Sequence, residues 1–287
     1  MNTIPFTMVT GHVTVRAAVA GVEGRFVIDT GCGLTSLDAG WARSLGIAPD
    51  AGPQFQAHGT GSVDASFATI PSLRVGDVAL GEQQVVLISL DSVSAATGHA
   101  LHGVIGFDFL SRWVVDIDYE ELVIRLHDPA SWTYDGSGAI VPVSLQYRIP
   151  IVDATVIPSA GVELHARLVL DLGSSRLCAR LLAGFAGKHP ELLDGGVDAP
   201  IGTGVGGEVR GRVRRVDEIR VGALTVRHPT TGVAADSRGA MGLSIFDGTL
   251  GTPLFERTRM IVDYARERII LEPRAGFDAP YEHELLP

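Results

Sequence analysis

The chain has 287 residues, of which 46% are hydrophobic and 20% charged, with 35 glycines and a formal net charge of −10. This composition excludes a disordered chain and predicts a packed core, in one large domain or two smaller ones. The negative charge argues against nucleic-acid partners and anionic membrane surfaces, because their phosphate groups would be repelled.

The termini and cysteines add further exclusions. No stretch approaches the roughly 20 apolar residues of a membrane span, and the first ten residues lack the basic start and apolar run of an export signal. We expect a cytoplasmic protein if the chain is full length and an exported one if a signal peptide was removed. Cys32 and Cys178 are too few for a disulfide framework and lack the clustered spacing of a metal site. We therefore expect no metal.

The first half of the chain reads as short strands rich in Val, Ile and Leu, as in residues 13–19. A short helix is expected over residues 39–45. The polar residues 118–122 lie between two apolar runs and predict a hairpin turn. Residues 128–138, with one proline and two glycines, interrupt the apolar pattern and predict a linker.

The second half repeats this reading. A strand is expected over residues 149–157, a short helix over residues 177–185, and a hairpin turn over residues 263–268. The chain is therefore expected to be all-β with few short helices. We place one lobe at residues 1–130 and the other at residues 139–287.

The two halves are copies of one unit. The segment Gly103-Val-Ile-Gly106-Phe-Asp-Phe-Leu aligns with Gly248-Thr-Leu-Gly251-Thr-Pro-Leu-Phe, and Gly106 and Gly251 are 145 residues apart. The segment Arg25-Phe-Val-Ile-Asp29-Thr-Gly31 aligns with Arg167-Leu-Val-Leu-Asp171-Leu-Gly173, 142 residues further on. Offsets this similar predict an internal duplication rather than a chance echo.

Asp29 and Asp171 are the candidate catalytic residues. Each follows an apolar run and precedes a glycine turn. A lone Asp-x-Gly is usually only a turn, but a pseudo-twofold packing of two copies would bring equivalent strand ends together at the interface. Two carboxylates held there cannot both ionise cheaply, so they share one proton.

These motifs, together with Ile4-Pro-Phe6, resemble the aspartic peptidases, particularly the retropepsin-like bacterial ones with two lobes in one chain. The resemblance implies two retropepsin-like β-barrel lobes related by a pseudo-twofold axis, with a cleft between them. It implies an endopeptidase of extended peptides, in which one aspartate activates a water as general base and the other donates to the scissile carbonyl. Both aspartates lie on one chain, so a monomer should suffice for activity.

The resemblance also implies substrate-binding residues beside the carboxylates and on two mobile hairpins. Beside the carboxylates these are Thr30, Gly31, Gly173 and Ser174. On the hairpins they are Gly59, Thr60 and Gly61 in the first copy and Gly202, Thr203 and Gly204 in the second.

Two positions depart from the family pattern. Leu172 replaces the hydroxyl residue that ties the two aspartate loops together, so half of that tie should be missing. Cys32 stands where many relatives have Ser or Ala, whereas the second copy keeps Ser174. A thiol is a weak donor, so we expect Asp29 to hold the shared proton and the pH optimum to move toward mildly acidic or neutral.

The alternative function is a peptide-binding pseudo-peptidase with an impaired dyad. Cys32 as a nucleophile is disfavoured, since no histidine lies near it in sequence.

Other charged residues have simpler explanations. Arg210, Arg212 and Arg214 alternate, which places them on one face of a strand. Such a stripe is usually solvated surface, although it could line the second hairpin and favour acidic peptides. Asp118 and Asp263 are equivalent in the repeat, and we interpret them as structural residues of hairpin turns.

Overall fold

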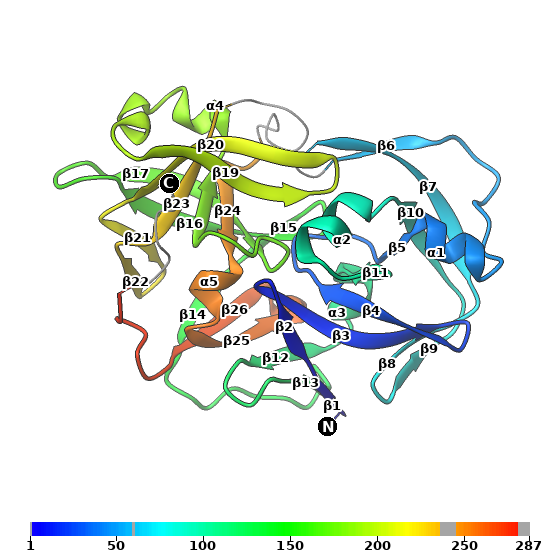
Figure 1. Ribbon diagram of the computed structural model, residues 1–287. Coiled ribbons are helices and arrows are strands. Elements are labelled where there is room, and N and C mark those ends of the chain that lie inside the picture. Colours follow the sequence, from blue (N-terminus) through cyan, green and yellow to red (C-terminus); the bar gives the residue numbers. More distant parts are fainter. Residues whose placement is uncertain (1, 59–60, 236–244, 281–287) are drawn as a thin grey trace.

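The computed structural model describes residues 2–58, 61–235 and 245–280. Strands dominate these residues, and the longest α-helix, α2 (Asp91–Thr97), has only 7 residues (Figure 1). The fold is therefore all-β with few short helices, as the sequence predicts. We call the part from β1 to β13 the first half and the part from β14 to β26 the second half.

The first half builds a ten-stranded sheet. In spatial order its strands are β6 (Phe55–His58), β7 (Ser62–Ile70), β10 (Gln83–Ile88), β5 (Ser36–Asp38), β11 (Gly103–Ile105), β4 (Val22–Ile28), β3 (His12–Val19), β8 (Leu73–Val75) and β9 (Val78–Leu80), with β2 (Thr7–Val9) paired to β3.

The second half builds a ten-stranded sheet with the same order. Its strands are β19 (Val197–Gly204), β20 (Gly207–Arg215), β23 (Thr230–Ala234), β18 (Ala179–Leu181), β24 (Gly248–Gly251), β17 (Leu164–Asp171), β16 (Ile149–Ile157), β21 (Glu218–Val221) and β22 (Leu224–Arg227), with β15 (Ser144–Gln146) paired to β16. The sheets agree strand by strand, which is the arrangement that the duplicated sequence predicts. The pseudo-twofold axis between them stays a prediction.

A six-stranded sheet joins the halves. Its order is β1 (Asn2–Pro5), β13 (Val123–His127), β12 (Val114–Asp118), β25 (Thr258–Asp263), β26 (Arg268–Pro273) and β14 (Ala139–Pro142). The first three strands come from one half and the last three from the other, with β12 and β25 antiparallel at the junction. The largest cluster of buried apolar side chains continues through this sheet from one half into the other.

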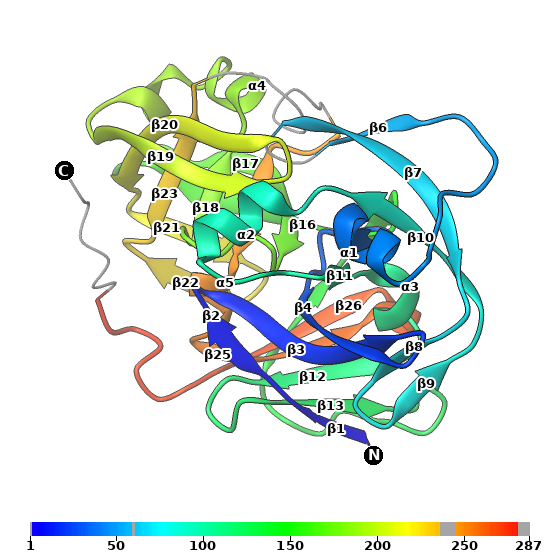
Figure 2. The same ribbon diagram turned by 45° about the vertical axis from the view of Figure 1, so that its right-hand side comes forward.

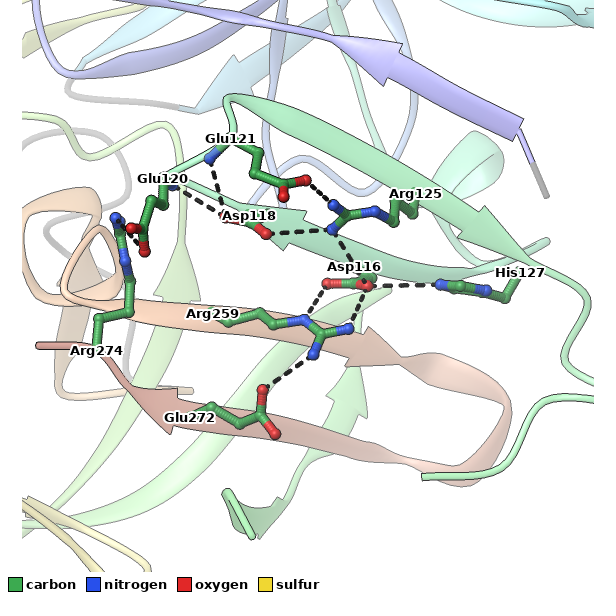
Figure 3. A network of polar contacts seen from close by, with 9 residues as sticks. All are labelled: Asp116, Asp118, Glu120, Glu121, Arg125, His127, Arg259, Glu272 and Arg274. Carbon is green, nitrogen blue, oxygen red and sulfur yellow. Dashed lines mark hydrogen bonds and ion pairs between the residues drawn. The ribbon is translucent and has the colours of Figure 1, made fainter. Parts of the chain in front are cut away.

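A buried ion pair spans the same junction. Asp116 on β12 is fully buried and accepts two hydrogen bonds from Arg259 on β25, from Nε at 2.9 Å and Nη2 at 2.8 Å. Figure 3 shows Arg125 and His127 of β13 approaching the same carboxylate, at 3.9 and 3.5 Å. A buried carboxylate without partners would be strongly destabilising, so this network favours the observed pairing of β12 with β25.

The remaining elements are short. They are α1 (Ala39–Ser44), α3 (Phe107–Leu110), α4 (Ala183–Ala186), α5 (Thr252–Phe255) and the 3-10 helices η1 (Pro190–Leu193) and η3 (Tyr264–Arg266). Helices α3 and α5 follow the repeated glycine segments, at Gly106 and Gly251, in the two halves.

Most predicted elements are confirmed, and one is wrong. The strands over 13–19 and 149–157 are β3 and β16, and the helix over 39–45 is α1. The helix over 177–185 is wrong, because residues 179–181 form β18 and helix begins only at Ala183. Strand β18 is buried and pairs with β23 on one side and β24 on the other, so long-range pairing overrides the local pattern.

The predicted hairpin turns join β12 to β13 and β25 to β26. In the first, Asp118 accepts hydrogen bonds from the amides of Glu120 and Glu121 at 3.0 and 3.1 Å. In the second, buried Asp263 pairs with Arg268 at 2.9 Å. The expected linker falls between β13 and β14; the division into lobes 1–130 and 139–287 stays a prediction.

Candidate active site

The two predicted catalytic aspartates come from equivalent central strands. Asp29 directly follows β4 and Asp171 is the last residue of β17. Each of these strands runs parallel to the strand of the repeated glycine segment, so Ile28 lies beside Ile105, and Asp171 beside Gly251. Both aspartates line one cavity of about 390 Å³, whose walls come from both halves.

The carboxyl group of Asp29 is held from both halves. Its Oδ1 accepts hydrogen bonds from the amide of Gly31 at 2.8 Å and from the amide of Gly173 at 3.1 Å. The two carboxyl groups lie next to each other, since a Cβ atom at Gly31 would lie 2.9 Å from Oδ1 of Asp171 and 3.2 Å from Oδ1 of Asp29. Burial, followed by the negative charge of Asp171, raises the pKa of Asp29 to about 8. Asp29 therefore keeps its proton to a higher pH than an ordinary aspartate.

Glycine is required beside each carboxylate. A Cβ atom at Gly31 would lie 2.9 Å from Oδ1 of Asp171, and one at Gly173 would lie 2.5 Å from Oδ2 of Asp29. Any side chain at either position would push against the opposite carboxyl group. The two Asp-x-Gly turns thus approach each other as closely as their backbones allow.

A single hydroxyl ties the two turns together. Buried Thr30 donates to the carbonyl of Leu170 at 2.6 Å and accepts from the amide of Leu172 at 3.2 Å. Leu172 itself is fully buried and has no hydroxyl to return the contact. Its carbonyl is instead held within its own half, by Thr252 Oγ1 at 3.0 Å. Half of the reciprocal tie is therefore present.

The predicted bonds from Cys32 and Ser174 to the aspartates are not formed. The Cys32 thiol donates to the carbonyl of Leu34, with sulfur and oxygen 3.0 Å apart. Its pKa is raised to about 12 by burial and by the charge of Asp29, so it stays a neutral thiol. Within the described residues, the Ser174 hydroxyl makes no hydrogen bond to Asp171; Ser174 contacts that residue through its amide, which donates to the Asp171 carbonyl at 3.1 Å.

Two hairpins cover the cavity, one from each half: β6–β7 and β19–β20. Figures 1 and 2 both show the turn between β19 and β20 beside the end of β6. The amide of Gly61 donates to the carbonyl of Val205 at 2.9 Å, and Ser92 of α2 donates to the carbonyl of Gly204 at 2.9 Å. Val205 packs against a buried apolar cluster of the first half. The hairpins are thus in contact with each other and with the opposite half.

The structure brings only some of the predicted substrate-binding residues to the cavity. Its lining includes Gly31, Gly173, Thr203 and Gly204. Four others do not line it: Thr30, Gly61, Ser174 and Gly202. Thr30 is buried beneath the carboxylates, and a Cβ at Gly61 would meet the Gly206 carbonyl of the other hairpin. Gly59 and Thr60 lie outside the described residues.

Sequence reasoning missed Arg180, which lies on β18 in the cavity wall. Arg180 is only 8% exposed, and its Nη2 is 4.0 Å from Oδ2 of Asp171. The register of the two sheets makes it the counterpart of Ser36, since Arg180 pairs with Thr249 and Ser36 pairs with Val104. The available signal was an arginine inside an apolar segment of the second repeat, in the stretch predicted to be helical.

His12 is a second missed residue. It begins β3 and lines the cavity, and the carbonyl of Val9 lies 3.2 Å from its Nδ1. Burial lowers the pKa of His12, against smaller effects from a hydrogen bond to the Gly173 backbone and from the charge of Asp171. The imidazole is therefore neutral at neutral pH and adds no positive charge beside the carboxylates.

The arginine stripe on β20 does not face the cavity. Arg212 donates to the carbonyl of Gly195, Arg214 donates to the carbonyl of Glu191 at 2.8 Å, and Arg210 pairs with Glu208 at 3.3 Å. Arg212 and Arg214 thus connect the hairpin to neighbouring segments, whereas Arg210 pairs within its own strand. The solvated-surface interpretation is the one that fits.

In the described part of the chain, no three His, Cys, Asp or Glu side chains are grouped so that they could hold a metal ion. No helix within residues 2–58, 61–235 and 245–280 combines the length and apolarity needed to cross a membrane.

Comparison with known proteins identifies one related family. Residues 15–109 match the model of a family described as aspartyl protease. The matched segment runs from β3 to α3 and includes Asp29 and the first glycine segment. No curated protein matches the chain.

Proposed function

The chain belongs, through residues 15–109, to the retropepsin-like aspartyl protease family, and we propose that it is an endopeptidase acting through Asp29 and Asp171. The substrate is an extended peptide or protein segment. Lobe 1–130 supplies one aspartate and lobe 139–287 the other, so a monomer is sufficient. The reaction uses no metal and no organic cofactor.

One observation carries this proposal. Two carboxyl groups from equivalent strands of two equally ordered sheets line one cavity and lie next to each other, with Gly31 and Gly173 packed against both. The raised pKa of Asp29 supports a pair with one proton at neutral pH, which is the charge state that acid–base catalysis of peptide hydrolysis needs.

The chemistry follows from this charge state. Ionised Asp171 takes a proton from a water molecule as that water attacks the scissile carbonyl carbon, and Asp29 donates its proton to the carbonyl oxygen. The tetrahedral intermediate collapses with cleavage of the C–N bond, and the departing amine takes the proton from Asp171. Asp29 regains a proton as the carbonyl of the new carboxyl group re-forms.

Substrate entry requires the hairpins to separate. A closed arrangement is supported by the hydrogen bond between Gly61 and Val205 and by the packing of Val205 against the apolar cluster of the first half. A bound peptide then lies beneath the hairpins and beside Gly31 and Gly173, with its backbone paired to Thr203 and Gly204 as an added strand.

A second candidate rests on Leu172. Because this residue cannot return the contact made by Thr30, a weakened tie could leave a peptide-binding protein with no turnover. Such a protein would hold peptides in the cavity without cutting them.

The test is to incubate a peptide library with the purified protein between about pH 3 and pH 8, spanning the reference carboxylate pKa upward. Mass spectrometry then identifies new peptide ends. Defined internal cleavage supports the endopeptidase. Peptides that co-purify with the protein uncut at every pH support the second candidate.

A further inference from the structure

The two sides of the cavity differ in polarity. Away from Asp29, the side formed by the first half is mainly apolar, with His12, Cys32 and Ser36 as its other polar residues and Val27, Leu34, Val86, Ile88, Leu90 and Val104 among its apolar ones. The equivalent region of the second half has Arg180 in place of Ser36 and Thr249 in place of Val104. An extended peptide crossing the cavity therefore meets two different chemical surfaces.

Arg180 is incompletely paired for a buried cation. Among the described residues its one ion pair is with Asp171, and at 4.0 Å this contact is longer than a hydrogen bond. Its Nε atom is buried and has no hydrogen-bond partner in the described part of the chain. A Cβ at Gly202 would lie 2.8 Å from Nη1, so the hairpin backbone passes directly over the guanidinium group. Burying a cation with so few partners is costly unless a ligand completes them.

Thr249 adds a second polar group at the same place. It lies opposite Arg180 in the β18–β24 pair, lines the cavity and is 4% exposed. Its hydroxyl Oγ1 is buried and also lacks a hydrogen-bond partner among residues 2–58, 61–235 and 245–280. Two adjacent donors without partners in the wall of one cavity indicate a binding site for a hydrogen-bond acceptor of a ligand.

We propose that Arg180 and Thr249 form a subsite for a carboxylate side chain of the peptide, on the side of the scissile bond covered by the second half. The inference rests on the proposed function and names its substrate class: peptides with an apolar side chain over the first half and an aspartate or glutamate over the second. A carboxylate suits this site because it accepts from both donors and neutralises the guanidinium charge. Asp171 does not fill that role, since its Oδ2 lies 4.0 Å from Nη2 of Arg180, beyond hydrogen-bond distance.

The first experiment measures cleavage of peptide pairs that differ only by glutamate or glutamine at one position. Above about pH 5, where the glutamate side chain is ionised, one position should favour glutamate by about tenfold or more in kcat/KM, as expected for a hydrogen bond to a charged group. A glutamate-to-glutamine ratio near one at every position overturns the proposal.

The second experiment assigns the preference to residues. Arg180→Leu should bring the ratio close to one, Arg180→Lys should keep part of it, and Thr249→Val, which installs the first-half residue, should reduce it. Arg210→Leu removes an exposed arginine of the hairpin and should leave the ratio unchanged. If Arg180→Leu slows both peptides of a pair equally, Arg180 serves only as a counter-ion for Asp171 and the subsite is wrong. Thr249→Val decides the matter if Arg180→Leu does not fold.

Binding separates this inference from the proposed catalysis. The same peptide pairs are titrated calorimetrically into Asp29→Asn, which keeps Arg180 and Thr249. A preference for glutamate that disappears in Asp29→Asn/Arg180→Leu supports the subsite even if the wild type cuts nothing, in which case only the peptidase proposal fails. Equal affinity for both peptides, or no binding of either, overturns the subsite.

Discussion

The hydroxyl of Thr30 accepts a hydrogen bond from the amide of Leu172 at 3.2 Å and so crosses from one half of the molecule to the other. The same hydroxyl donates to the carbonyl of Leu170 at 2.6 Å. This side chain therefore makes two contacts with the opposite turn, beside the hydrogen bond from the amide of Gly173 to Asp29.

Removing this hydroxyl should loosen the two aspartate turns. Thr30→Ala leaves the amide of Leu172 and the carbonyl of Leu170 buried without their partner, which costs about 1–3 kcal/mol per unsatisfied group. We expect lower stability in urea and a fall in kcat that exceeds any change in KM. Thr30→Ser keeps the hydroxyl and should retain most of both; equal losses in Ala and Ser would show that the methyl group, not the tie, matters.

The hairpin contact should respond to a single methyl group. A Cβ at Gly61 would lie 2.6 Å from the carbonyl oxygen of Gly206, so Gly61→Ala forces the two tips apart. Cleavage of a standard peptide should show a higher KM, because the closed cover over the substrate forms less readily. Gly81→Ala is the matched control, since nothing lies within 4 Å of its Cβ. An unchanged KM in Gly61→Ala would mean that the tips do not close on the substrate.

Cys32 should be chemically inert despite its place in the cavity wall. Burial and the charge of Asp29 raise its pKa to about 12, so the reactive thiolate is scarce at neutral pH. Iodoacetamide at pH 7.5 should leave peptide cleavage intact. Cys32→Ser should also preserve the pH profile, because a serine hydroxyl can donate to Leu34 as the thiol does. Rapid inactivation by iodoacetamide, or a pH profile shifted in Cys32→Ser, would show that the Cys32 thiol does influence Asp29.

The free energy of unfolding should depend on pH, because folding raises the pKa of Asp29. The folded pKa of about 8 lies above the ordinary aspartate pKa of 3.8, so the folded protein binds this proton more tightly than the unfolded chain. The resulting stabilisation is complete below about pH 4 and is lost as pH rises to about 8. Asn cannot ionise, so Asp29→Asn should gain stability relative to wild type across this range in urea titrations. Exposed Asp153→Asn is the control; a wild-type-to-variant difference that does not change with pH contradicts the assignment.

The sequence could place the aspartates because the information lay in local segments that occur twice. Asp29 and Asp171 each follow an apolar strand and precede a glycine turn, and the repeat alone requires the two turns to be equivalent. The strand order of each half, by contrast, depends on pairings between distant segments, such as β5 with β10 and β18 with β23. No local pattern specifies those pairings.

The errors have the same origin. Arg180 was missed and β18 was predicted as helix, since its neighbours β23 and β24 lie some 50 to 70 residues further along the chain. Thr30 was expected to touch substrate, but the opposite turn covers it. Ser174 and Cys32 were expected to tune the carboxylates by hydrogen bonds, whereas burial and the neighbouring charge dominate the pKa of Asp29.

The central claim is that Asp29 and Asp171 together hydrolyse peptides, and the most direct test is to replace each of them with asparagine. Wild type, Asp29→Asn, Asp171→Asn and the control Asp153→Asn are compared on one library-derived substrate, with thermal unfolding confirming that each is folded. Loss of acid–base catalysis should lower kcat by about 10²-fold to 10⁴-fold in either site variant, with peptide still bound, and the control should match wild type. Cleavage that survives in a folded Asp29→Asn or Asp171→Asn variant would contradict the account.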